Sequence, residues 1–428
     1  MYNLIIYLYL LGVAIASCFS DKVRKMWRGE RDAFRLLREK VEPAARYVWF
    51  HAASLGEFEQ GRPLMEELRR QRPELKILLT FFSPSGYEVR KDYEGADIVC
   101  YLPLDTPLNA RRFLRLIRPE VAYFIKYEFW YNYLHILKHR QVPVYSVSSI
   151  FRDGQIFFRW YGRQYGAVLK CFTHFFVQNE KSRELLASIG LTNVTITGDT
   201  RFDRVLQIKE AQAPVPGIAD TTAAEGELSE TKVFVAGSSW PPDEEIFIRY
   251  FREHPGWRLI IAPHVIGEDH LQQIEKMLEG FRVQRYSRLN SDPSPRLKAG
   301  HSPLPRRSAG GEAIIIDCFG LLSSLYRYAT VSYVGGGFGV GIHNTVEAAV
   351  WGVPVIFGPN NGKFQEAQEL KACGGAFEIK GYDDFAAIMD RFAADPRLTE
   401  QAGQKAGLYV RRKAGATRKI LDDTLPTI

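Results

Sequence analysis

Short runs of apolar residues alternate along most of the chain with stretches in which apolar positions recur every three or four residues. Short apolar runs bounded by turn residues are typical of buried strands, and the helical spacing seen in Pro63–Arg70 and Leu108–Ile117 predicts amphipathic helices. The predicted strands are Tyr47–His51, Lys76–Phe82, Ile98–Leu102, Val121–Ile125, Val142–Val147, Phe175–Gln178 and Val194–Thr197, followed by Val233–Ala236, Leu259–Ala262, Ala313–Ile316, Val331–Val334 and Val355–Phe357. This alternation predicts an α/β fold of parallel sheets with helices on both faces.

A polar stretch separates the two series of strands. Residues 211–230 (AQAPVPGIADTTAAEGELSE) are poor in aromatic residues and rich in Ala, Pro, Gly, Glu and Thr, which indicates a linker. Residues 289–311 are expected to form a long surface loop in the second half. Two similar halves leave a cleft, where a ligand meets the carboxyl ends of both sheets. We therefore expect an N-terminal domain over 22–210, a C-terminal domain over 231–400, and a helix within 401–428 that packs back on the N-terminal domain.

The N-terminal segment is apolar. Tyr2–Ser20 contains no charged residue, and its length is about that which a helix needs to cross the hydrocarbon core of a bilayer. The basic residues that follow at once are Lys22, Arg24, Lys25 and Arg28. Because cationic flanks remain on the cytoplasmic side, we expect residues 1–21 to anchor a cytoplasmic body to the inner membrane, either as a single span or as a helix lying in the membrane surface.

Two other interpretations of this segment remain open. One is a cleaved lipoprotein signal peptide, because Ile15-Ala16-Ser17-Cys18 resembles a lipobox. The residues before the apolar run nevertheless lack the positive charge that a signal peptide carries. The other interpretation is a short helix buried in the protein.

The composition narrows the class of protein. A chain of 428 residues suggests two or three domains, and 46% hydrophobic with 25% charged residues is typical of a soluble globular chain, which excludes wholesale disorder and a polytopic membrane protein. The net charge of +7 suits a partner that carries phosphates, such as an anionic lipid surface or a nucleotide, without demanding nucleic acid. The five cysteines include no CxxC pair, so neither a disulfide framework nor a cysteine zinc site is expected.

The glycine-rich stretch Tyr333–Ala349 (YVGGGFGVGIHNTVEAA) is the strongest candidate for a phosphate-binding site. An apolar strand leads into a loop with five glycines and then into a helix that we expect to begin near Asn344. Glycine lets the backbone approach a ligand closely, and free N–H groups at a helix N-terminus bind phosphate. Glu347, one turn into the helix, is placed to accept hydrogen bonds from ribose hydroxyls. The alternative is a tight turn in which Glu347 only complements the helix dipole.

Two acidic residues follow strands of the first half. Glu57, in His51–Glu57 (HAASLGE), would project from a turn that contains a glycine, at the carboxyl end of the first strand. A carboxylate there can act as a general base on an acceptor hydroxyl, although a solvated acid at a helix start is the alternative. Glu128, in Lys126–Asn132 (KYEFWYN), ends another apolar strand and is expected to face the cleft.

Two strand ends in the second half carry small turns. Gly237 and Ser238 lie in Val235–Trp240 (VAGSSW), and Phe319 and Gly320 end the run IIIDCFG. Backbone N–H groups in such turns can meet a phosphate or the edge of a base. Each turn taken alone is explained equally well by ordinary turn chemistry.

Taken together and in this order, these stretches resemble the Kdo transferases, which transfer 3-deoxy-D-manno-octulosonic acid (Kdo) from CMP-Kdo to a lipid A precursor in lipopolysaccharide synthesis. The motifs that carry the resemblance are HAASLGE, YLPLDTP (Tyr101–Pro107), KYEFWYN, GDTRFD (Gly198–Asp203), AGSSW, IDCFGLL, GGGFGVGIHNTVEA and FGPNNGKFQEA (Phe357–Ala367). The resemblance covers nearly the whole chain. It implies a GT-B fold, in which two Rossmann-like domains face a cleft, and an inverting sugar transfer that uses neither metal nor cofactor.

The resemblance also implies roles for individual residues. Glu57 matches the catalytic base, and Glu128 inherits the acidic role of an ETELW-type motif whose first Glu is Lys126 here. The implied CMP-Kdo-binding residues are Gly237, Ser238, Pro263, His264, Phe319, Gly320, Asn344 and Glu347. His264 stands where the family has an Arg after the proline, and Lys363 stands where Asn is usual.

The expected function is therefore that of an inverting glycosyltransferase. Glu57 would take the proton of an acceptor hydroxyl, while backbone N–H groups would stabilise the phosphate charge of the leaving CMP. The expected partners are CMP-Kdo, a lipid A precursor and an anionic membrane surface, with no nucleic acid. Two alternatives are a different GT-B sugar-nucleotide transferase or epimerase, and a non-catalytic membrane-anchored protein that binds a sugar nucleotide.

Overall fold

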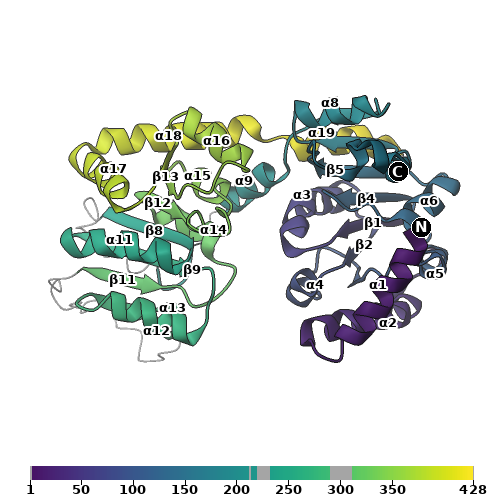
Figure 1. The fold of residues 1–428 in the computed structure, drawn as a ribbon, viewed down its shortest axis with the longest axis horizontal. Coiled ribbons are helices and arrows are strands. Elements are labelled where there is room, and N and C mark those ends of the chain that lie inside the picture. The colour runs from purple at the N-terminus through teal and green to yellow at the C-terminus, as the bar shows by residue number, and fades with distance from the viewer. Residues whose placement is uncertain (1, 212–213, 219–231, 290–310, 428) are drawn as a thin grey trace. The chain divides into compact units, whose positions relative to one another are not determined.

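The computed structural model describes residues 2–211, 214–218, 232–289 and 311–427. Most of the linker expected over 211–230 and of the loop expected over 289–311 lies outside these residues. The chain forms two compact units, an N-terminal unit of residues 1–204 with 413–428 and a C-terminal unit of residues 205–412 (Figure 1). Each unit is described by itself, so the cleft expected between the two halves stays a prediction.

The N-terminal unit is built on a seven-stranded parallel sheet in the order β3-β2-β1-β4-β5-β6-β7. Its strands are β1 (Tyr47–Ala52), β2 (Lys76–Phe81), β3 (Ile98–Tyr101), β4 (Val121–Ile125), β5 (Val144–Ser149), β6 (His174–Val177) and β7 (Val194–Ile196). The strand order reverses between β1 and β4, so the loops that follow these two strands separate to opposite faces. Ligands of open parallel sheets bind in the crevice at such a point.

Helices cover both faces of this sheet. Successive residues of a strand point to opposite faces, and in these strands the residues on both faces are largely apolar. Trp49 of β1 packs with residues of α2 (Asp21–Lys40), α5 (Pro107–Ile117) and α6 (Tyr131–His139). Phe50 points to the opposite face and packs with residues of α3 (Leu55–Gln71) and α19 (Ala416–Thr424). Further helices of this unit are α4 (Pro84–Arg90), α7 (Arg163–Leu169) and α8 (Glu180–Ser188).

Residues from the end of the chain complete the N-terminal unit. The helix α19 lies against its sheet, where Ile420 is fully buried and the Tyr123 hydroxyl donates a hydrogen bond of 2.7 Å to Thr424. The two carboxylate oxygens of Asp203 accept the backbone N–H groups of Gly415 and Thr417, which lie at the start of α19. Asp203 therefore provides the N-terminal cap of the last long helix.

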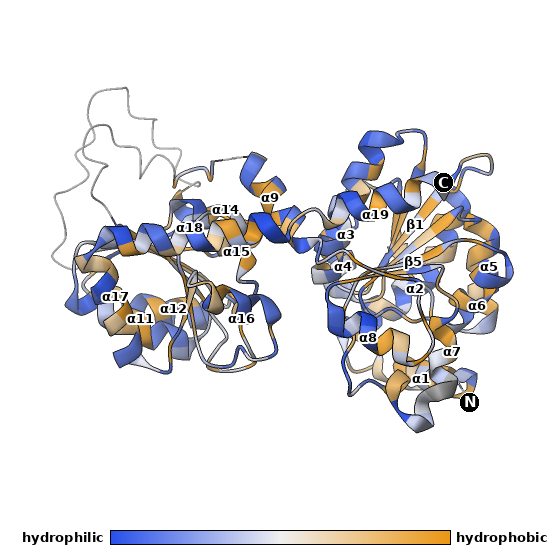
Figure 2. Ribbon diagram, turned by 90° about the horizontal axis from the view of Figure 1, so that it is seen from above, coloured by the Kyte–Doolittle hydropathy of each residue, from blue (hydrophilic) through white to orange (hydrophobic). Residues whose placement is uncertain are grey.

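The N-terminal segment forms the helix α1 (Tyr2–Ala16), whose first residues are tied to the body of the unit. The Tyr2 hydroxyl donates a hydrogen bond of 2.7 Å to Asp105, and the Asn132 amide donates one of 2.8 Å to Asn3. Figure 2 shows that α1 is mostly apolar along its length. In the described part of the chain, no helix reaches the length and the hydropathy that crossing a bilayer requires. The anchor expected over residues 1–21 is therefore not confirmed.

The C-terminal unit is built on a second seven-stranded parallel sheet, in the order β10-β11-β9-β8-β12-β13-β14, in which β11 lies between β10 and β9. Its strands are β8 (Lys232–Ser239), β9 (Trp257–Pro263), β10 (Arg282–Arg285), β11 (Glu312–Ile315), β12 (Val331–Val334), β13 (Val355–Phe357) and β14 (Ala376–Glu378). Its helices are α9 (Arg201–Ala211), which begins in the N-terminal unit, α11 (Pro241–Glu253), α12 (Glu268–Met277), α13 (Tyr286–Leu289), α14 (Leu322–Leu325), α15 (Val346–Ala349), α16 (Gln365–Ala372), α17 (Tyr382–Ala394) and α18 (Pro396–Lys413). The strand order reverses between β8 and β12, where the predicted phosphate-binding turns lie.

Candidate active site

Glu57 lies in the first turn of α3, directly after the central strand β1. Its carboxylate reaches back over the turn and accepts a hydrogen bond of 2.6 Å from the Ala53 N–H. Burial raises the pKa of Glu57 to about 7 with help from the nearby charge of Glu128, while the Ala53 and Ser54 N–H groups and the charge of Lys126 lower it by less. Glu57 is thus not the freely solvated acid of the alternative interpretation, and its pKa suits a general base near neutral pH.

Glu128 follows β4, the strand next to β1 at the reversal of strand order, and this topology brings the two acids together. Its side chain is only 13% exposed. The Trp130 indole N–H donates a hydrogen bond of 2.7 Å to one carboxylate oxygen of Glu128, and Nε2 of His51 lies 3.2 Å from the same oxygen. His51 is fully buried. It belongs to the motif HAASLGE, but sequence reasoning assigned it no role. The signal available was a polar residue within an otherwise apolar strand.

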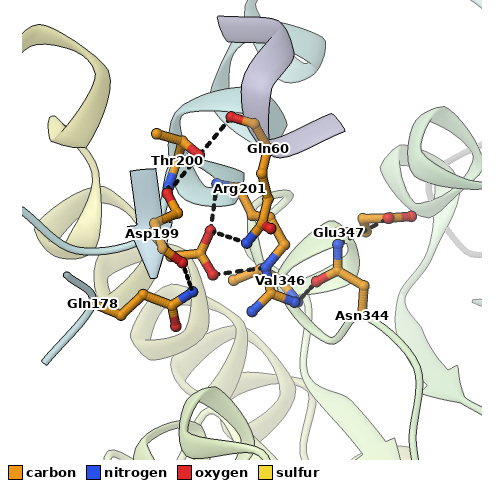
Figure 3. A network of polar contacts seen from close by, with 9 residues as sticks. Gln60, Gln178, Asp199, Thr200, Arg201, Asn344, Val346 and Glu347 are labelled. Carbon is orange, nitrogen blue, oxygen red and sulfur yellow. Dashed lines mark hydrogen bonds and ion pairs between the residues drawn. The ribbon is translucent and has the colours of Figure 1, made fainter. Parts of the chain in front are cut away.

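A buried polar cluster formed by the GDTRFD motif supports α3, the helix that carries Glu57 (Figure 3). Asp199 accepts hydrogen bonds of 2.9 Å from the Gln60 side chain and 2.8 Å from the Arg201 guanidinium. The Thr200 hydroxyl donates to the Gln60 carbonyl at 2.6 Å. Although burial alone would raise it, the pKa of Asp199 lies below its ordinary value because of Arg201 and these hydrogen bonds. The cluster therefore holds a charged acid within the unit and fixes one turn of α3.

In the C-terminal unit, the turn after β8 packs against the glycine-rich loop after β12. Ser238 has a left-handed backbone conformation, with φ of 52°, and the buried Ser239 hydroxyl donates a hydrogen bond of 2.7 Å to Glu244. A Cβ atom on Gly335 would collide with the carbonyl of Ser238. A Cβ atom on Gly237 would collide with the Tyr326 hydroxyl, so close packing alone requires glycine there.

Asp243 of α11 fixes the course of the glycine-rich loop. Its carboxylate accepts hydrogen bonds of 2.9 Å from the Gly336 and Trp240 N–H groups and one of 2.7 Å from the Tyr333 hydroxyl. Burial raises the pKa of Asp243, and these hydrogen bonds oppose that shift. Sequence reasoning did not select Asp243, because an acid in the first turn of a helix is common and two of its partners, Tyr333 and Gly336, lie about ninety residues away along the chain.

Asn344 and Glu347 interact directly. The Asn344 amide donates a hydrogen bond of 2.9 Å to one oxygen of Glu347 (Figure 3). The Ser323 hydroxyl donates one of 2.7 Å to the other oxygen. The helix α15 begins at Val346, two residues after Asn344 and close to the expected start, and the Asn344 side chain accepts the Val346 N–H at 3.3 Å. These contacts therefore hold the Glu347 carboxylate in one orientation.

His264 follows β9 and lies in an aromatic stack. Its ring is 4.9 Å from that of Trp240 and 4.3 Å from that of His343. Burial and the neighbouring His264 lower the pKa of His343 to about 4. Trp240 and His343 were not predicted as site residues, because nothing in their spacing indicates that β8, β9 and the glycine-rich loop meet.

The other predicted donor residues differ in exposure. Pro263 is the buried last residue of β9. Phe319 is 81% exposed, and Gly320 adopts a φ of 92° with open space where a side chain would stand. A left-handed glycine beside open space is suited to a close backbone contact with a ligand. In the described residues, no group of three or more His, Cys, Asp or Glu side chains is arranged to hold a metal ion.

Known proteins resemble this chain in both sequence and fold. Residues 28–204 match the family model described as 3-Deoxy-D-manno-octulosonic-acid transferase (kdotransferase). The chain is 25% identical to a 3-deoxy-D-manno-octulosonic acid transferase of Aquifex aeolicus over 88% of this chain and 95% of the relative. It is 27% identical to that of Bordetella pertussis, over 89% and 87% respectively. The resemblance to the Kdo transferases is thereby confirmed. The range matched by the Kdo transferase model contains Glu57, Glu128 and Asp199.

Solved structures of similar fold include a UDP-GlcNAc 2-epimerase from Neisseria meningitidis bound to UDP-GlcNAc. It has a TM-score of 0.61 at 14% identity and covers 89% of this chain and 100% of its own. The glycotransferase of kitacinnamycin has a TM-score of 0.53 at 14% identity, with 90% and 100% covered. At this level of identity the likeness shows the fold alone, which is the GT-B-like pairing of two parallel-sheet units.

Proposed function

We propose that this protein is an inverting glycosyltransferase that moves Kdo from CMP-Kdo to a lipid A precursor in lipopolysaccharide synthesis. The observation that carries the proposal is Glu57, a carboxylate with a pKa raised to about 7, which lies after the central strand of a unit that matches the Kdo transferase model. Its relatives over most of the chain carry that activity in their names.

Glu57 is the proposed general base. With a pKa raised to about 7, it can take the proton of an acceptor sugar hydroxyl as that oxygen attacks the anomeric carbon of Kdo. The leaving group is CMP, whose phosphate already bears a negative charge and departs without a proton. The protein's part at the leaving group is therefore to stabilise charge, which backbone N–H groups can do.

The turns after β8, β11 and β12 are the proposed donor site. Ser238 and Gly320 have left-handed backbone conformations in these turns. Glu347 would accept hydrogen bonds from the ribose hydroxyls, and its contacts with Asn344 and Ser323 orient it for that role. We also assign to this site the remaining predicted donor residues, namely Gly237, Pro263, His264 and Phe319.

We further propose that α1 and α2 hold the enzyme against the cytoplasmic face of the inner membrane, where its acceptor lies. Leu4, Leu8 and Leu11 of α1 are 65%, 60% and 59% exposed, so the helix presents an apolar surface. Lys25, Arg28 and Arg35 of α2 line a cavity of about 400 Å³, to which Asp32, Glu39 and Glu88 also contribute. We expect the basic residues to meet anionic headgroups. Flotation with vesicles of anionic and of neutral lipid tests this location. Loss of binding to both when Leu4 and Leu8 are replaced by Glu is expected, and unchanged binding would contradict it.

The activity itself is tested by incubating the purified protein with CMP-Kdo and a lipid A precursor and weighing the product by mass spectrometry. The expected product is the precursor with one or more Kdo residues added. UDP-GlcNAc in place of CMP-Kdo is the control that separates this activity from that of a UDP-sugar transferase or epimerase. Conversion of UDP-GlcNAc without any Kdo transfer would overturn the proposal.

A further inference from the structure

His51 is the polar residue of a strand whose six residues are all buried. In the register of the sheet it lies beside Thr80 of β2 on one side and Phe124 of β4 on the other. A buried imidazole is costly unless both ring nitrogens have hydrogen-bond partners. His51 has both, because Nδ1 lies 2.8 Å from the Thr80 hydroxyl and Nε2 lies 3.2 Å from the Glu128 carboxylate.

The protons of this chain of contacts can be placed by counting donors. The Trp49 indole N–H can only donate, and it lies 2.8 Å from the Thr80 oxygen. The hydrogen of the Thr80 hydroxyl then has two acceptors within reach, Nδ1 of His51 at 2.8 Å and the Phe50 carbonyl at 3.3 Å. Nε2 lies 3.0 Å from the Trp130 indole nitrogen, which can only donate, and 3.2 Å from the Glu128 carboxylate, which when ionised can only accept. The indole N–H is nearer to the carboxylate, at 2.7 Å, so we place the ring proton on Nε2, facing Glu128, and make Nδ1 the acceptor of the Thr80 hydroxyl.

Glu128 thus receives two donors on one oxygen, the Nε2–H of His51 and the indole N–H of Trp130. Neither donor carries a positive charge in this arrangement, so both hold the Glu128 carboxylate in place without cancelling its charge. A guanidinium in the same position would hold the acid but neutralise its field.

We propose that His51 is a positioning residue for this reaction, which through its Nε2–H holds the charged Glu128 carboxylate beside the base Glu57. The proposal rests on the proposed function in taking Glu57 as the base. The groups that face Glu57 are the Ala53 and Ser54 N–H groups of its own turn, Glu128 and Lys126 from the segment after β4, and the Tyr127 hydroxyl, whose own pKa is raised by burial and by Glu57 among other charges. Of these, Glu128 acts to raise the pKa of Glu57 and so to make it a stronger base.

Two substitutions separate positioning from support of the fold. In His51→Gln the amide nitrogen can take the place of Nε2, whereas in His51→Asn it can take only that of Nδ1. We expect His51→Asn to move the acid limb of the kcat/KM profile about one pH unit lower and to reduce turnover above pH 8 roughly three- to tenfold. His51→Gln should keep the limb close to that of the unchanged protein. Equal losses of turnover in both variants with an unmoved limb would show a structural role only and overturn the proposal.

Trp130→Phe provides a second variant if a change at buried His51 prevents folding. It removes the other donor to Glu128 from a partly exposed position, and we expect the same downward shift of the acid limb. An unmoved limb in folded Trp130→Phe would argue against control of Glu57 through Glu128.

A readout without substrate distinguishes failure of this inference from failure of the proposed function. Titration of the Glu57 carboxyl carbon by NMR, assigned with Glu57→Gln, is expected to have a midpoint near 7. The midpoint should fall in His51→Asn and stay in His51→Gln. If these shifts are found but CMP-Kdo is not used, only the assigned activity fails. If Kdo is transferred but the midpoint does not move in His51→Asn, only the role of His51 fails.

Discussion

In both the N-terminal and the C-terminal unit the strand order reverses beside the first strand, β1 or β8, yet different chemistry follows the strands at these two reversals. After β1 and β4 the chain places Glu57 and Glu128, two acids supported by buried polar contacts. After β8 and β12 it places Ser238 and the glycine-rich loop, where closely packed backbone leaves little room for side chains. We infer from this comparison that one fold supplies the position, at the reversal of strand order, and that local residues distinguish the proposed site of proton transfer from the proposed site of phosphate binding.

The largest effect is expected from Glu57→Gln. The amide keeps the size of the side chain but cannot accept a proton, so turnover should fall by about 10²–10⁴-fold. Binding of CMP, measured by calorimetry, should not change, because the donor groups belong to the C-terminal unit. The melting temperature should not fall either, since burial already disfavours the charged form of Glu57. Turnover above a third of the original value would exclude Glu57 as the base and make Glu128 the next candidate.

A matching substitution in the C-terminal unit should instead weaken the binding of CMP. Glu347→Ala removes charge-assisted hydrogen bonds to ribose, worth roughly 1.5–3 kcal/mol, so CMP should bind about ten- to a hundredfold more weakly. Calorimetry measures this loss directly. Glu366→Ala, which removes a partly buried acid of α16, is the control for a general change of charge. Unchanged CMP affinity in folded Glu347→Ala would place the nucleotide elsewhere.

The buried acids of the N-terminal unit also predict a dependence of stability on pH. Burial raises the pKa of Glu30 to about 7, above its ordinary value of 4.5, so the folded protein binds this proton more tightly than the unfolded chain does. The contribution of Glu30 to the unfolding free energy should therefore fall as pH rises from about 4.5 to 7, by roughly 1–3 kcal/mol in total.

Glu30→Gln isolates this contribution because glutamine stays neutral at every pH. We expect the variant to be more stable than the unchanged protein at pH 8.5 and similar to it at pH 4, as measured by urea unfolding. A variant that is less stable at pH 8.5 would show instead that the charged carboxylate, through its bond to the Leu104 N–H, stabilises the fold.

The smallest effect concerns the helix that returns from the C-terminal unit to complete the N-terminal one. Asp203→Ala removes the cap of α19 and should cost about 1 kcal/mol of helix stability. Faster hydrogen exchange at Ile420 and its neighbours in α19 is the expected observation. Asp203→Asn keeps a capping oxygen and should change exchange much less. Equal exchange in all three proteins would mean that packing of α19 against the sheet, and not its cap, holds the helix.

Much of each sheet could be predicted from the sequence alone. The apolar runs Val121–Ile125, Val331–Val334 and Val355–Phe357 are strands with those same bounds. The strands β10 (Arg282–Arg285) and β14 (Ala376–Glu378) were not predicted, because edge strands need no continuous apolar run and theirs are short and partly polar. The glycine-rich loop and Glu57 were also identified, since turn residues after an apolar strand are visible in the sequence.

The sequence by itself determined the α/β class, the residues at the strand ends and the order of the motifs that resemble those of the Kdo transferases, because these depend on residue type and local spacing. Only the tertiary structure decided which residues act together. His51 and Glu128 are 77 positions apart, and Asp243 and Gly336 are 93 apart. Their contacts follow from which strands become neighbours in the sheet, and that order depends on packing across the whole unit rather than on any local pattern.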